Sequence, residues 1–257
     1  MNKIVSLNDP NIKEFLNLKE FNLKNENHIC AQSEKVVLKL LQSPFKTLKV
    51  FATENFFSRH EKVFSSKLNI KKLVAEKTLI KTIIGHNHHQ GVFALAERPS
   101  YYPITSLDSK ILILNGLTSP ENVGSLCRTA AAFNINSIII DHKTVNPYLK
   151  RPIRVSMGNI FQLKIHLSED LPTTLSVLKK HSYKIFGTAN EEGSISIESS
   201  DLPRRAALII GSEGHGIDPE IKYLCDNILK INVTHNVMHL NAASAGAIFL
   251  YELSKKR

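Results

Sequence analysis

Residues 111–133, which read ILILNGLTSPENVGSLCRTAAAF, decide the fold class of this chain. Ile111–Leu114 form a short apolar run that predicts a fully buried strand, and the four residues after it form a turn that contains a glycine. Ser119 is a good helix N-cap, and Pro120 follows where its missing N–H costs nothing. The stretch therefore predicts a strand, a turn and a helix whose N-terminus opens at the carboxyl end of the strand, where ligands bind in open α/β sheets.

Within this predicted helix, Gly124 and Arg128 are four residues apart and share a face. Helical side chains lean toward the N-terminus, so Arg128 would lie over Gly124 with its guanidinium near Asn122. A glycine inside a helix costs about 1 kcal/mol relative to alanine, which suggests a packing or ligand role. Two interpretations stay open: an arginine that serves a site, or a surface charge beside a glycine that admits a neighbouring helix.

The composition indicates a globular chain from a reducing compartment. Its 257 residues are 42% hydrophobic, which suffices for the core of one large or two ordinary domains. Cys30, Cys127 and Cys225 are widely spaced and form no CxxC pair, which argues against a disulfide framework or a thiolate zinc site. The first residues are polar with mixed charge, and no 18-residue apolar span occurs. We therefore expect a cytoplasmic protein without a membrane partner.

The net charge of +10 and the pI of about 9.4 favour polyanionic partners, which a basic protein binds with release of counterions. Residues 1–106 hold 16 Lys and Arg against 9 Asp and Glu, whereas residues 107–257 hold 17 against 14. Most of the excess therefore lies in the first part of the chain. The alternative is that this charge serves only solubility.

The first part of the chain, residues 1–98, predicts a small α/β domain, and the Pro- and Tyr-containing segment 99–108 predicts a linker. Helices are expected at 10–23, 34–41, 54–67 and 77–84, and strands at 48–52, 72–74 and 91–96. His86, His88 and His89 form a cluster without Cys or carboxylate at ligand spacing. We interpret the cluster as a polar turn and expect no metal.

The second part, residues 109–257, alternates predicted strands and helices in the manner of a mostly parallel sheet flanked by helices. Strands are expected at 111–114, 137–140, 162–165, 183–187, 206–210 and 227–231. Helices are expected at 121–133, 151–159, 171–181, 219–225 and 240–253.

A glycine-bearing loop, GSEGHG at 211–216, follows the predicted strand 206–210. Its GxxGxG spacing differs from the GxGxxG of dinucleotide sites, so the ordinary Rossmann fingerprint is missing. Glycines after a strand still let backbone approach a ligand closely. Glu213 is either a ligand-binding or catalytic group, or an acceptor that ties the turn. Farther on, the small residues NAASAGA at 241–247 indicate that some backbone packs very closely against the last helix.

These three elements together resemble the SpoU (TrmH) family of RNA ribose methyltransferases. Asn122, Gly124 and Arg128 in NxGxxxR spacing, the GSEGxG loop at 211–216 and IxVxxxVxxLNAA at 231–243 stand in the order of the family's motifs one, two and three. RVSMG at 154–158 lies between motifs one and two. The segments EKVVLKLL (34–41) and HHQGVFAL (88–95) are similar to the substrate-binding domain that precedes the catalytic domain in many members and resembles a ribosomal protein.

The resemblance implies a SPOUT fold, in which the C-terminal segment of domain 109–257 is threaded into a deep trefoil knot that holds S-adenosylmethionine. Such knots are rare exceptions that periodicity cannot predict. The resemblance also implies a homodimer with composite active sites, assembled through the knotted domain.

Site residues follow from the resemblance, position by position. The implied cofactor-binding residues are Gly211, Ile231 and Leu240 through their backbones, with Ser212, Glu213 and Gly214 shaping the loop. The implied catalytic residues are Arg128, which would engage the RNA phosphate and assist deprotonation of the ribose hydroxyl, and Asn122, Glu213 and Asn241, which would complete the site.

Motif three departs from the family pattern in three places. His239 and Ala243 stand where serines are usual or frequent, and His235 stands where glycine is common. The resemblance implies S-adenosylmethionine-dependent 2′-O-methylation of a ribose in structured RNA, with ribosomal RNA favoured over transfer RNA because many ribosomal members carry the first domain. The departures keep one alternative open, an RNA-binding protein of the same fold without methyltransferase activity.

Overall fold

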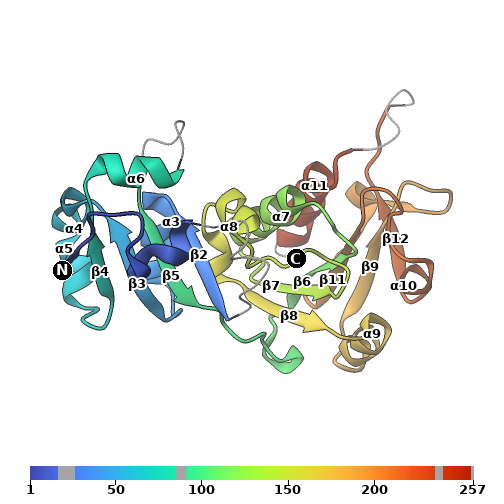
Figure 1. Cartoon of the computed structure of the whole chain (residues 1–257). Helices are drawn as coiled ribbons and strands as arrows, with labels where there is room; N and C mark the ends of the chain where they lie inside the picture. The colour runs from blue at the N-terminus through green and yellow to red at the C-terminus, as the bar shows by residue number, and fades with distance from the viewer. Residues whose placement is uncertain (17–26, 85–90, 235–239, 256–257) are drawn as a thin grey trace. The chain divides into compact units, whose positions relative to one another are not determined.

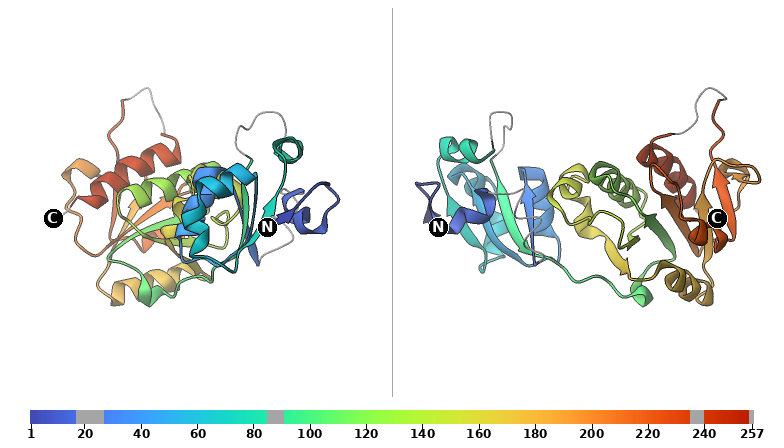
Figure 2. Two further views of the ribbon diagram at one scale, coloured as in Figure 1. Left: turned by 90° about the vertical axis from the view of Figure 1, so that its left-hand side faces the viewer. Right: turned by 45° about the vertical axis from the view of Figure 1, so that its right-hand side comes forward.

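The computed structural model describes residues 1–16, 27–84, 91–234 and 240–255 (Figures 1 and 2). The chain divides into two compact units: unit 1 contains Met1–Pro99 and Tyr148–Phe161, and unit 2 contains Ser100–Pro147 and Gln162–Arg257. The segment Tyr148–Phe161, which we expected in the second domain, thus groups with the first.

Unit 1 contains a five-stranded mixed sheet in the order β1-β4-β3-β5-β2. Three neighbouring strands, β1, β4 and β3, are parallel, and the next two pairings are antiparallel. The strands are β1 (Asn2–Lys3), β2 (His28–Gln32), β3 (Thr47–Ala52), β4 (Lys71–Val74) and β5 (Phe93–Glu97). The sequence predicts three of them and misses β1, which has two residues, and β2, whose run HICAQ has a single β-branched residue.

The helices of unit 1 lie near their predicted positions, but the expected helix 54–67 is broken. His60, at φ −116° and ψ 25°, separates α4 (Glu54–Arg59) from α5 (Glu61–Ser65). The expected helix 10–23 begins with a 3₁₀ turn, and its part beyond residue 16 lies outside the described residues. The other helices are α1 (Lys13–Leu16), α3 (Glu34–Gln42), α6 (Lys77–Ile84) and α8 (Lys150–Val155).

Aromatic rings pack in separate groups within unit 1. Phe15, Phe51 and Phe93 lie together with centroids 5.5–6.2 Å apart. Elsewhere in the unit, Phe45 contacts Tyr148 and Phe161, with centroids 6.0 and 5.6 Å away. These contacts explain why the segment Tyr148–Phe161 groups with unit 1, because its apolar side chains are buried there.

Unit 2 contains a seven-stranded sheet in the order β10-β12-β9-β11-β6-β7-β8, and every pairing is parallel. This confirms the predicted mixed α/β fold with a mostly parallel sheet, while the trefoil knot stays a prediction. The strands are β6 (Lys110–Asn115), β7 (Ser137–Asp141), β8 (Lys164–Ser168), β9 (Lys184–Thr188), β10 (Ile195–Ser196), β11 (Ala206–Gly211) and β12 (Asn227–Lys230).

Helices cover both faces of this sheet. The helices α7 (Pro120–Ala132) and α11 (Ala242–Ser254) run side by side on one face, whereas α9 (Leu171–Lys180) lies on the opposite face (Figures 1 and 2). Leu175 of α9 belongs to one buried cluster with Ile111 and Ile113, and α10 (Pro219–Tyr223) adds Ile221 to it. Side chains alternate along each strand, so one face of the sheet presents apolar residues to α7 and α11 and the other face presents them to α9 and α10.

Candidate active site

The first component of the candidate site is the N-terminus of α7. The Ser119 hydroxyl oxygen accepts a hydrogen bond from the Asn122 backbone N–H at 3.3 Å, and Pro120 is in the first turn, as the sequence predicts. The Asn122 side chain is polar, yet the residue is only 8% exposed. A buried amide needs hydrogen-bond partners, and two segments far away in the sequence supply them.

Asn122, Glu213 and Asn241 meet at this point. The Asn122 Nδ2 donates a hydrogen bond to the Glu213 carboxylate, and the Asn241 Nδ2 donates to the Asn122 Oδ1 at 3.2 Å. The Asn241 Oδ1 also accepts from the backbone N–H groups of Ala243 and Ser244, so the same side chain caps α11. The structure thus brings together three of the four predicted catalytic residues, which we call the polar triad.

Arg128, the fourth, lies exposed on α7. It makes no hydrogen bond with the polar triad, and no other described residue forms a hydrogen bond or ion pair with it. Its guanidinium is therefore available to an anion from solution, and a guanidinium suits the bidentate binding of a phosphate.

The second component is the loop after β11. Ser212 and Gly216 exchange backbone hydrogen bonds of 2.9 and 3.0 Å, which closes the loop into a tight turn. A Cβ atom at Gly211 would lie 2.2 Å from the backbone carbon of Gly216 and 2.3 Å from the nitrogen of Ile217. Only glycine fits there, because the loop folds back on its own strand end. Glu213 does not tie this turn; its carboxylate instead accepts a hydrogen bond from Asn122 of α7.

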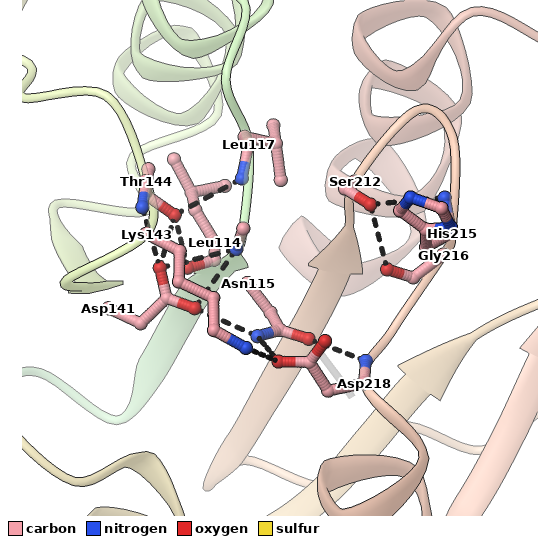
Figure 3. Close-up of polar contacts among 11 residues, drawn as sticks. Leu114, Asn115, Leu117, Asp141, Lys143, Thr144, Ser212, His215, Gly216 and Asp218 are labelled. Atoms are coloured by element: carbon pink, nitrogen blue, oxygen red, sulfur yellow. Dashed lines mark hydrogen bonds and ion pairs between the residues drawn. The ribbon is translucent and has the colours of Figure 1, made fainter.

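A buried amide, Asn115, links the turn after β6 to the 211–217 loop (Figure 3). Asn115 ends β6 and lies opposite Gly211 in the sheet register. Its Nδ2 donates to Asp141 Oδ2 at 2.8 Å and to Asp218 Oδ2 at 3.1 Å, and its Oδ1 accepts from the Asp218 N–H at 2.8 Å. One side chain that is 2% exposed therefore fixes the exit of the 211–217 loop against the turn after β6.

Asp141 and Asp218 extend this cluster. The Asp141 carboxylate accepts hydrogen bonds from the Gly116 N–H at 3.0 and 3.2 Å and from the Thr144 hydroxyl at 2.7 Å. The Lys143 ammonium donates to the Asp218 carboxylate at 2.8 Å (Figure 3). This hydrogen bond, followed by that from the Asn115 amide, lowers the pKa of Asp218. The sequence analysis missed these residues, although Asn115 and Asp141 stand at the carboxyl ends of two predicted strands.

A pocket of about 140 Å³ lies beside the start of α11. Two of the predicted cofactor-binding residues, Ile231 and Leu240, line it, whereas 211–214 do not. The sequence analysis missed residues 188–190, at the carboxyl end of β9, which form another wall of the pocket. Their position at the end of a parallel strand was the signal that could have identified them. The other residues that line the pocket are Lys230, Val233, Ala245 and Phe249.

Metal ligands and reactive thiols are two other features to consider in the described part of the chain. No group of three or more His, Cys, Asp or Glu residues among residues 1–16, 27–84, 91–234 and 240–255 is arranged to hold a metal ion. Burial raises the pKa of the Cys127 thiol to about 12, so this residue is not a nucleophile near neutral pH.

Within the described residues, no helix has the length and apolar character that crossing a membrane requires. The five histidines at 86, 88, 89, 235 and 239 lie outside the described residues.

The comparisons with known proteins agree on one family. The model of the SpoU rRNA methylase family matches residues 109–251. An uncharacterized tRNA/rRNA methyltransferase of Mycobacterium bovis is 24% identical over 258 residues, which cover 96% of this chain and 89% of the relative.

Solved structures share the fold of the whole chain. An rRNA methyltransferase from Sinorhizobium meliloti, solved with AdoMet bound, superposes with a TM-score of 0.84 at 22% identity, covering 98% of this chain and 97% of the other. A solved RNA 2′-O ribose methyltransferase gives a TM-score of 0.78, also at 22% identity, over 98% and 97% of the two chains.

Proposed function

This chain belongs to the SpoU rRNA methylase family, and we propose that it transfers the methyl group of S-adenosylmethionine to the 2′-hydroxyl of a ribose in structured RNA. The observation that carries the proposal is the polar triad, in which side chains from three sequence motifs meet at one helix N-terminus. The S. meliloti protein with bound AdoMet supports the choice of cofactor, and the similar 2′-O ribose methyltransferase supports the choice of acceptor.

In this proposal the adenine of the cofactor occupies the pocket beside α11. Ile231, Leu240 and Phe249 give it apolar walls, and its volume of about 140 Å³ resembles that of a cavity that accepts one aromatic ring, roughly 150 Å³. In this proposal the backbones of Ile231 and Leu240 hold the ring, and the 211–214 loop shapes the adjoining space for the rest of the molecule. Bound S-adenosylmethionine supplies a methyl group already activated by its sulfonium.

The protein's own contribution is mainly alignment. Holding the ribose hydroxyl in line with the methyl group is worth about 7–11 kcal/mol, because bringing the reactants together no longer costs entropy. As the O–CH3 bond forms and the S–CH3 bond breaks, the sulfonium would become a neutral thioether and the hydroxyl proton would pass to solvent water. Arg128 would stabilise the negative charge that develops on the ribose oxygen while it binds the neighbouring phosphate. Arg128 is a poor general base, because the pKa of a guanidinium exceeds about 12. The polar triad fixes the relative positions of α7, the 211–217 loop and α11.

The substrate that we favour is ribosomal RNA over transfer RNA, with unit 1 docking the RNA and unit 2 performing the transfer. We also infer that the C-terminal segment of unit 2 is threaded as a trefoil knot and that two copies form a homodimer. Two exposed apolar side chains of α11 support the dimer, Ile248 at 40% and Tyr251 at 50% exposure. They are three residues apart and share one face of the helix.

The test is methyl transfer by the purified protein to total RNA from cells that lack it, with labelled S-adenosylmethionine. We expect label in ribosomal RNA, and mapping 2′-O-methylation in cells with and without the protein should locate one nucleotide that loses its methyl group. Label on a base instead of a ribose would contradict the 2′-O assignment. RNA binding without cofactor binding or transfer would instead favour a binding protein of the same fold.

A further inference from the structure

Unit 1 contains a groove that the methyl-transfer site does not use. It has a volume of about 160 Å³ and lies where β3 ends and the helices α4 and α6 begin. Several polar and basic side chains line it, together with an apolar floor that includes Phe56. The polar and basic residues are Thr53, Asn55, Arg59, Lys77 and Lys81. We call this site the unit 1 groove.

The groove has a surplus of positive charge. Lys77 and Lys81 lie one turn apart on α6, both are exposed, and neither forms an ion pair or hydrogen bond with another described residue. Glu34 is the single carboxylate among the described residues of the lining, and it is already paired. Arg59 donates two hydrogen bonds to it, at 3.1 and 2.9 Å, and His60 contacts it at 2.9 Å. Two cations therefore remain for an anion from solution.

The floor and the edge of the groove have a different character. Phe56, Ile80 and Val92 provide apolar atoms, and all three are buried core residues at 1–4% exposure. Asn55 is exposed at the edge, and no described residue hydrogen bonds to its side-chain amide. An apolar floor, an amide with free donors and acceptors, and two cations match the base, the base edge and the flanking phosphates of a nucleotide.

A second pocket of about 590 Å³ adjoins the groove and shares Thr53, Asn55 and Lys77 with it. Lys3 lines this pocket and also has no ion-pair partner among the described residues. Glu54 and Glu76 also line this pocket, so the surplus of positive charge is confined to the unit 1 groove.

We propose that the unit 1 groove binds an unpaired nucleotide of the RNA substrate, with the base against the floor, Asn55 at the base edge, and Lys77 and Lys81 on the flanking phosphates. This inference rests on the proposed function, since it takes the substrate to be RNA. Unpaired bases in loops are the usual targets of sequence-specific RNA recognition, because bases in an RNA helix are hidden in a deep and narrow groove.

The first experiment measures the affinity of the full chain for a labelled RNA stem–loop at several salt concentrations. The variant Lys77→Ala/Lys81→Ala removes both cations, and Lys62→Ala/Lys67→Ala is the matched control, because these lysines belong to the same unit and line neither pocket. Each lost phosphate contact lowers the slope of log K against log salt by about 0.7–0.9. We expect the first variant to lose about 1.5 from this slope and the control to keep it. Equal slopes in the two variants would overturn the proposal.

The second experiment tests the base site with Asn55→Ala. The wild type should bind the stem–loop more tightly than a blunt RNA duplex of the same number of nucleotides. Asn55→Ala should reduce this preference severalfold and leave the salt slope unchanged, because no phosphate contact is lost. A wild type without preference, or an unchanged preference in Asn55→Ala, would refute the role of the groove in binding an unpaired base.

Methyl transfer separates a failure of this inference from a failure of the proposed function. The rate is measured as a function of RNA concentration at saturating cofactor. Lys77→Ala/Lys81→Ala should keep the kcat of the wild type, because the transfer site in unit 2 is intact, while its KM for RNA rises. If the wild type is active and the variant has the same KM for RNA as the wild type, the groove proposal is wrong while the proposed function stands. If the wild type transfers no methyl group but the salt slopes differ as expected, the proposed function fails and the RNA-binding groove stands.

Discussion

Asn122 shows how much of the candidate site depends on single side chains. Its amide is buried, and it donates to Glu213 and accepts from Asn241, so one residue joins segments 91 and 119 positions away in the sequence. Asn115 likewise joins the turn after β6 to the 211–217 loop, through hydrogen bonds to Asp141 and Asp218. At this scale, function needs amides that both donate and accept, which a carboxylate or an apolar residue cannot replace.

Arg128→Ala should abolish methyl transfer and leave cofactor binding intact. Removing one group that stabilises developing charge costs about 10²–10³-fold in kcat, and Arg128 does not line the pocket beside α11. Transfer assays and cofactor titration of the variant measure the two effects. Arg204→Ala, which removes another exposed arginine of unit 2, should behave as the wild type. Unchanged turnover in Arg128→Ala would refute the role that we assign to it.

Asn115→Ala should destabilise unit 2 by about 1–3 kcal/mol, because it leaves the Asp218 N–H and the Asp141 carboxylate short of a buried partner. Denaturant unfolding of the variant measures this loss. Asn136→Ala is the control, since among the described residues its side-chain amide has a single hydrogen-bond partner, the exposed Asn134 side chain. Equal stabilities of the two variants would show that the Asn115 cluster does not hold the loops.

At the scale of elements, glycines decide how closely backbones approach. A Cβ at Gly246 of α11 would lie 2.2 Å from the Leu126 side chain of α7, which explains the small residues that the sequence places in this helix. Gly211 is more constrained, because backbone atoms rather than a side-chain end occupy the space of its Cβ. The space beside Gly246 is therefore filled by a side chain of α7, and the predicted close approach of a backbone to α11 stays a prediction.

Gly211→Ala should disrupt the 211–217 loop, whereas Gly214→Ala should not. The first Cβ would overlap the backbone of Gly216, and the second would have no heavy atom within 4 Å. Overpacking of this kind costs about 1–3 kcal/mol or more, and the distorted loop should also weaken cofactor binding and transfer. Thermal unfolding of the two variants provides the comparison of stability, and cofactor titration of Gly211→Ala against the wild type measures the loss of affinity. Wild-type stability and affinity in Gly211→Ala would show that the loop tolerates a side chain.

At the scale of the whole molecule, the exposed side of α11 is the feature to explain. Ile248 and Tyr251 lie on it, and the Tyr251 ring contacts that of Phe133 at 5.7 Å. Apolar side chains that gather on one helix face are typical of an interface between subunits. This arrangement supports the proposed homodimer, in which a second copy covers α11.

Tyr251→Glu should therefore convert a dimer into monomers, because a carboxylate would be buried against an apolar surface. Analytical ultracentrifugation gives the oligomeric state, and transfer activity should fall with it if the active sites are composite. Tyr223→Glu is the matched control, since Tyr223 is 90% exposed on α10. A monomeric wild type, or a Tyr251→Glu variant that still dimerises, would contradict the proposed interface.

Much of this protein could be predicted from local signals. The strand, turn and helix at 111–133, the parallel alternation of unit 2 and the Ser119 cap follow from apolar runs and capping residues, which act over a few neighbouring positions. The helix break at His60 and strand β2 could not be predicted from local signals, because tertiary packing overrides weak local preferences there. Asn122, Glu213 and Asn241 could be singled out by motif, but no local signal joins them.

The sequence by itself determined the fold class, the family and the identity of the candidate catalytic side chains, because periodicity, capping and motif spacing are properties of short segments. Only the tertiary structure decided that the polar triad meets at the N-terminus of α7, that Asn115 ties the two loops, and that the segment Tyr148–Phe161 packs in unit 1. The physical reason is that buried polar groups and apolar rings take whichever partners the packed chain brings to them. Those partners are dozens of residues away, where no pattern along the chain records them.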